Sequence, residues 1–146
     1  MAAMTDYLEN KLIDQLFRAQ AFVFPATFYI GLLTAAPTDA TAGTEVTGGA
    51  YARSAVTNGL TAWAGTQAAA SVVASTGSSG TTSNNAAVAF PAPTVAWGVV
   101  THIAIWDALT VGNMLFYSAL TVPKTINAGD AAPAFAIGAL TIQIDN

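Results

Sequence analysis

The chain has 146 residues, of which 53% are hydrophobic and only 8% are charged. This length suits one domain with a core of its own. Four basic residues against eight acidic ones argue against nucleic-acid binding, because that binding depends on clustered Lys and Arg. Without cysteine, the chain can have no disulfide, thiol catalysis or thiolate metal site. So few charges are typical of a protein that covers part of its surface with partners or with copies of itself.

The uncharged run of residues 19–36 is the best candidate for a membrane span. It contains Pro25 and Gly31, and its second half has a strand-like pattern, so we expect no transmembrane helix. The N-terminus carries Asp6 and Glu9 where a secretory signal needs basic residues. These features favour synthesis in the cytoplasm.

Residues 5–18 predict the one helix of the chain and hold five of its twelve charged residues. Thr5 suits the N-cap position, and Asp14 and Arg18 form an i,i+4 pair. An isolated helix of this length is marginal in water, so its apolar stripe needs a partner. We expect this partner to be the β-body of the same chain, with a neighbouring subunit as the alternative. The stripe consists of Leu8, Leu12, Ile13, Leu16 and Phe17.

Residues 26–145 predict a β-body, because short alternating apolar runs are separated by turn formers. The segment 75–85, STGSSGTTSNN, lacks apolar anchors and predicts a flexible loop or a hairpin tip. A bulge at Gly138 would bring the apolar residues of the last strand onto one face. The whole chain, 1–146, is therefore predicted to be a single-domain antiparallel β-sandwich or jelly-roll-like fold with one N-terminal helix. Strands are expected near residues 28–33, 51–57, 69–75, 86–90, 97–107, 114–122 and 135–145.

Few residues offer chemistry. His102 is the only histidine, and no nucleophile motif accompanies it, so we expect a sheet-face residue and no catalytic site. The oxygen-bearing side chains from Asp39 to Glu45 do not match a calcium loop, and no lysine follows Gly77 and Gly80 as a phosphate loop requires. We therefore expect no catalytic, cofactor-binding or metal-binding residues.

Aromatic residues fall on both faces of the predicted strands 97–107 and 114–122. Most are expected in the core, but one set could be buried only on assembly. Together with the helix stripe, this pattern gives five candidate interface residues: Leu12, Phe17, Trp97, Trp106 and Tyr117.

Seven strings follow one another along the chain from Met4 onward: MTDYLENKLIDQLFR, TFYIGLLTAAPTD, GGAYAR, SNNAAVAFPAP, WGVVTHIAIWD, GNMLFYSAL and GALTIQID. In this order they resemble a family of small tailed-bacteriophage virion proteins, commonly labelled phage tail fibre proteins. Met4 matches the usual start of that family.

This resemblance implies a non-catalytic structural component of the virion, made in the host cytoplasm. Its expected partners are other virion proteins, either capsid or tail subunits, and further copies of itself, with no nucleic acid, membrane span or cofactor. The chain lacks the repetitive shaft and heptads of a long fibre, so capsid decoration or cement and a tail-fibre-associated role both stay open. The alternative is a receptor- or glycan-binding module at the tail tip, with exposed aromatic residues as stacking platforms.

Overall fold

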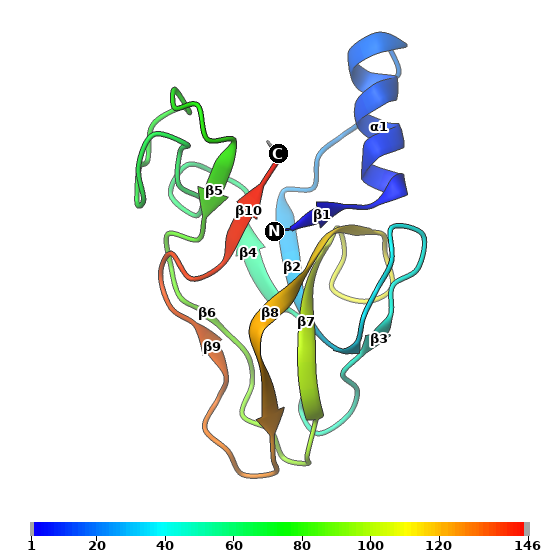
Figure 1. Ribbon diagram of the computed structural model, residues 1–146, viewed down its shortest axis with the longest axis vertical. Helices are drawn as coiled ribbons and strands as arrows, with labels where there is room; N and C mark the ends of the chain where they lie inside the picture. The colour runs from blue at the N-terminus through cyan, green and yellow to red at the C-terminus, as the bar shows by residue number, and fades with distance from the viewer. Residues whose placement is uncertain (1, 145–146) are drawn as a thin grey trace.

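A computed structural model, which describes residues 2–144, has a central antiparallel sheet, two small sheets and one helix (Figure 1). The central sheet has the strand order β1-β8-β7-β2-β3, and β4 also pairs with β2. The small sheets are β10-β5 and β6-β9. In chain order the elements are β1 (Ala3–Met4), α1 (Asp6–Phe17), β2 (Thr27–Ala35), β3 (Thr44–Glu45), β4 (Ser54–Thr57), β5 (Thr81–Ser83), β6 (Val88–Ala89), β7 (Gly98–Trp106), β8 (Met114–Ile126), β9 (Ala134–Phe135) and β10 (Thr141–Gln143).

The main core lies between one face of the central sheet and the two small sheets. Ile30 of β2 and Ile103 of β7 pack with Val88 of β6 and Ile142 of β10, all at least nine-tenths buried. Each such aliphatic side chain contributes about 1.5–3 kcal/mol on burial. This arrangement confirms the predicted mainly β, sandwich-like fold with a single N-terminal helix. The assignment of residues 1–146 to one domain stays a prediction.

The helix begins at the N-cap residue that the sequence predicts. Thr5 Oγ1 accepts a hydrogen bond from the backbone N–H of Leu8 and donates one to the carbonyl of Met114 at 2.6 Å, which fixes the first turn to β8. At the other end Ala19 has φ +54°, a left-handed conformation that stops the helix. The predicted helix 5–18 is thus confirmed.

Three local predictions are wrong. Residues 69–75 form no strand, because the side chain of Gln67 donates to Ser71 Oγ and to the Ala74 carbonyl and holds the segment in an irregular loop. Gly138 has φ +75° and sits in a turn that divides the last predicted strand into β9 and β10, rather than in a bulge. The predicted end of that strand at Asp145 lies outside the described residues.

The third error concerns the predicted loop 75–85, which is only partly irregular. Its second half contains β5 and the buried Asn84, which is 1% exposed. Asn84 donates to the carbonyls of Ala86 and Ala136 and accepts from the N–H of Leu140 at 2.9 Å. A polar side chain therefore supplies the anchor that the apolar pattern did not predict.

Candidate interaction surfaces

The N-terminal arm, which we define as α1 and residues 18–26, projects from one end of the sheet (Figure 1). Only Leu8 of the apolar stripe is buried, and Leu12 is half-buried. Ile13, Leu16 and Phe17 are 50%, 71% and 81% exposed. The expectation that the whole stripe packs on the β-body is therefore wrong for its second half, because the helix axis leads away from the sheet after the first turns.

The segment that returns from the helix to the sheet braces the arm. Phe22 packs edge to face against Tyr7 and Phe24, with ring centroids 6.4 and 4.7 Å apart, and its N–H donates to Gln15 Oε1 at 2.6 Å. Val23 on the same segment is 86% exposed. The arm thus holds its own shape while it presents apolar side chains to solvent.

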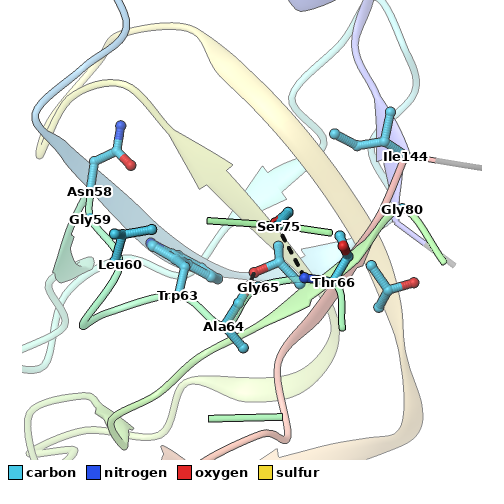
Figure 2. A pocket seen from close by; sticks show the side chains of 12 residues that line it. Asn58, Gly59, Leu60, Trp63, Ala64, Gly65, Thr66, Ser75, Gly80 and Ile144 are labelled. Carbon is cyan, nitrogen blue, oxygen red and sulfur yellow. Dashed lines mark hydrogen bonds between the residues drawn. The ribbon is translucent and has the colours of Figure 1, made fainter. Parts of the chain in front are cut away.

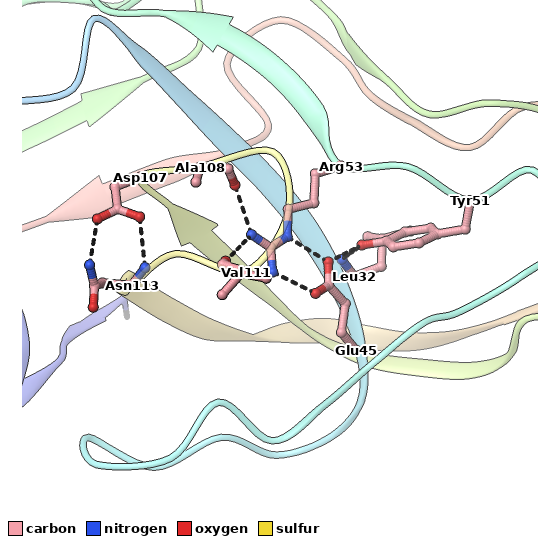
Figure 3. Close-up of polar contacts among 8 residues, drawn as sticks. All are labelled: Leu32, Glu45, Tyr51, Arg53, Asp107, Ala108, Val111 and Asn113. Atoms are coloured by element: carbon pink, nitrogen blue, oxygen red, sulfur yellow. Dashed lines mark hydrogen bonds and ion pairs between the residues drawn. The ribbon is translucent and has the colours of Figure 1, made fainter.

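An ionic cluster around Arg53 joins Glu45 of β3 to the turn between β7 and β8 (Figure 3). Arg53 is 8% exposed and makes two hydrogen bonds to the Glu45 carboxylate, at 2.8 and 2.7 Å. Its guanidinium also lies over the Trp106 ring, 3.8 Å from the ring centre. Tyr51 donates its hydroxyl proton to Glu45 and accepts from the N–H of Leu32. The pKa of Tyr51 lies above its usual value, mainly because the side chain is buried.

Arg53 also holds the hairpin tip between β7 and β8. Its Nη1 donates to the carbonyls of Ala108 and Val111 at 2.7 and 2.9 Å. Asp107 closes the base of the tip by accepting two hydrogen bonds from Asn113 (Figure 3). Val111 itself is 85% exposed with φ +57°, a strained conformation for a β-branched residue. The buried cluster is therefore a structural clamp on an exposed turn.

An open apolar groove of about 800 Å³ lies near β5 (Figure 2). We call it the Trp63 groove. Leu60 and Ile144, which are 54% and 62% exposed, line it together with Trp63, and a hydrogen bond from the Thr66 N–H to Ser75 Oγ closes one side. Among the described residues that line it, none is charged. The groove could not be predicted from the sequence, because it forms only where residues 58–66, residues 75–82 and Ile144 come together in the fold.

The structure does not bring the five candidate interface residues together. Trp97 and Trp106 are core residues, 5% and 6% exposed, and the indole N–H of Trp97 donates to the Gly49 carbonyl. Tyr117 is half-buried and donates its hydroxyl proton to Asp39. Leu12 and Phe17 lie on the arm, where Phe17 has by far the greater exposure. An interface role for these residues stays a prediction.

The residues considered for chemistry have ordinary partners. His102 Nδ1 lies 2.8 Å from Thr101 Oγ1, and Glu45 is paired with Arg53. Within residues 2–144, no group of three or more His, Cys, Asp or Glu side chains is placed to hold a metal ion. The described part of the chain also has no helix with the length and apolar character needed to cross a membrane.

Comparison with known proteins gives the family. The model of the family described as podophage GP4 fiber I protein gp80 matches residues 3–143, which is nearly the whole chain. The chain belongs to this family. A search of curated proteins found no match. Membership in the gp80 family confirms the resemblance to phage tail fibre proteins and supports a phage structural role.

Proposed function

We propose that the chain is a non-catalytic tail-fibre component that joins its neighbours in the virion through the N-terminal arm. The observation that carries this proposal is the unpartnered apolar surface of the arm. Ile13, Leu16 and Phe17 stand at i, i+3 and i+4 on one helix face, the spacing by which amphipathic helices enter hydrophobic grooves. Val23 and Phe24, on the return segment, extend the exposed apolar surface.

The size of this surface fits a specific contact. An aromatic side chain can bury about 150–250 Å², and Phe17 leaves 81% of its surface in solvent. With Ile13, Leu16, Val23 and Phe24, the arm offers several hundred Å², of the order of the ~800 Å² that each partner buries in a standard interface. Burying this surface would also stabilise a helix that is too short to be stable alone.

The name of the matched family favours the tail over the capsid. That name describes a fibre protein, so a tail-fibre location has support that a capsid decoration or cement role lacks. The glycan-binding alternative is weaker than the sequence suggested. Trp97 and Trp106, the tryptophans in the candidate interface set, are in the core and offer no open stacking face.

The test is incorporation of arm variants into phage particles. Phe17→Asp places a charge on the exposed arm, where it should leave the folded chain intact but weaken docking. Val122→Asp is the matched control, since Val122 is 72% exposed on β8. We expect particles made with Phe17→Asp to contain at least tenfold less of the chain by quantitative mass spectrometry, and particles with the control to match the wild type. Equal incorporation of both variants would overturn the proposal.

A further inference from the structure

We propose that the arm of one copy docks into the Trp63 groove of a second copy. This inference rests on the proposed function and names its partner. The chain carries both an exposed apolar helix end and an open apolar groove, and neither has a partner within the described residues. In such a contact each copy inserts its arm into the Trp63 groove of one neighbour and binds the arm of another neighbour in its own groove.

The chemistry of the two surfaces agrees. The groove is lined by Leu60, Trp63 and Ile144 with small uncharged residues around them, and its volume of about 800 Å³ can take the side chains of Leu16 and Phe17. The described lining carries no charge that would be desolvated without a partner.

The charges on the arm also permit this contact. Asp14 and Arg18 lie beside the apolar residues of the helix end and form an ion pair at 2.9 Å, so they neutralise each other locally. Docking of Phe17 therefore does not bring an unpaired charge against the uncharged groove. The helix end of the arm and the Trp63 groove can therefore come together without burying an unpaired charge.

The placement of the two surfaces sets the kind of assembly. Figure 1 shows α1 and β5 at the same end of the long axis of the molecule, on opposite sides of it. A rotation about an axis along this direction carries the arm of one copy to the groove of the next. Such a contact is heterologous, and it closes into a ring when the rotation closes. In a ring each chain buries two patches, which doubles the area that one arm contributes.

Crosslinking can test the contact directly, because the chain has no cysteine. Purified Phe17→Cys and Leu60→Cys chains are mixed in equal amounts and oxidised. We expect a disulfide-linked dimer of the two variants as the main product. A mixture of Phe17→Cys with Val122→Cys serves as the control and should give at least tenfold less. A dominant Phe17→Cys homodimer would show arm-to-arm pairing and overturn the proposal.

Oligomeric state gives a second test with reciprocal variants. Light scattering should show an oligomer for the wild type and monomers for Phe17→Asp and Leu60→Asp separately. Mixing the two variants leaves one intact arm and one intact groove, so we expect a dimer that cannot close. A wild-type chain that stays monomeric, or a Leu60→Asp chain that assembles normally, would overturn the proposal. If the isolated wild type is monomeric but Phe17→Asp is lost from particles, this inference fails while the proposed function stands.

Discussion

Replacing Arg53 with Met tests how much the buried clamp contributes to stability. The change removes two hydrogen bonds to Glu45 and two to the carbonyls of the hairpin tip. It also leaves the Glu45 carboxylate, whose side chain is 23% exposed, without its cation. Removing one partner of a buried ion pair costs about 3–5 kcal/mol. Water and Tyr51 still reach Glu45, and Met keeps much of the packing on Trp106, so we expect a loss near the lower limit, about 3 kcal/mol.

Urea unfolding followed by tryptophan fluorescence measures this loss. Arg18→Met is the matched control, because its ion pair with Asp14 joins side chains that are 69% and 31% exposed. An exposed i,i+4 pair contributes about 0.3–0.5 kcal/mol, so the control should barely move the midpoint. Adding Glu45→Gln to Arg53→Met should cost less than the two single losses combined, since each single change removes the same interaction. If Arg53→Met shifts the midpoint no more than Arg18→Met does, the clamp does not stabilise the fold.

Three further predictions concern single side chains. Unfolded tyrosine ionises near pH 10, whereas burial raises the pKa of Tyr51 in the folded chain. The unfolding free energy should therefore fall above pH 10. Urea unfolding at pH 9 and pH 11 should show a smaller fall for Tyr51→Phe than for the wild type. Asn84→Ala removes three hydrogen bonds made by a side chain in a residue that is 1% exposed, and should cost about 2–4 kcal/mol. Asn85→Ala, whose side-chain bonds are 3.3 Å or longer, should cost less than about 1 kcal/mol. Equal losses by chemical denaturation would contradict this ranking. Val111→Asn relieves the strain of a β-branched residue at φ +57° and should raise the melting temperature. The control Val122→Asn, on β8, should lower the melting temperature. A lower melting temperature for Val111→Asn would show that the turn is not strained.

The sequence predicts those parts of the fold that depend on local periodicity. The helix follows from the N-cap Thr5 and the stripe that begins at Leu8, and the long strands β2, β7 and β8 follow from alternating apolar residues. Short strands were less predictable. The pairing of β5 with β10 depends on Asn84, whose partner Leu140 lies 56 residues further along the chain.

The interaction surfaces show the same limit. An amphipathic helix predicts that a face needs a partner, but the direction in which α1 leaves the sheet decides that Leu16 and Phe17 stay exposed. The Trp63 groove forms only when the loop at Leu60, the segment around β5 and the chain near Ile144 come together. Likewise, the sequence pattern predicts only that Arg53 lies near a strand. Its contacts with Glu45 and with the hairpin tip form only in the folded sheet.

The proposed tail location and the docking of the arm can both be seen in intact phage particles. A cryo-electron microscopy map of intact particles should show this β-rich chain in the tail, with Leu16 and Phe17 of α1 buried against a neighbouring subunit. A map that places the chain on the capsid, or in the tail with α1 free in solvent, would contradict the account.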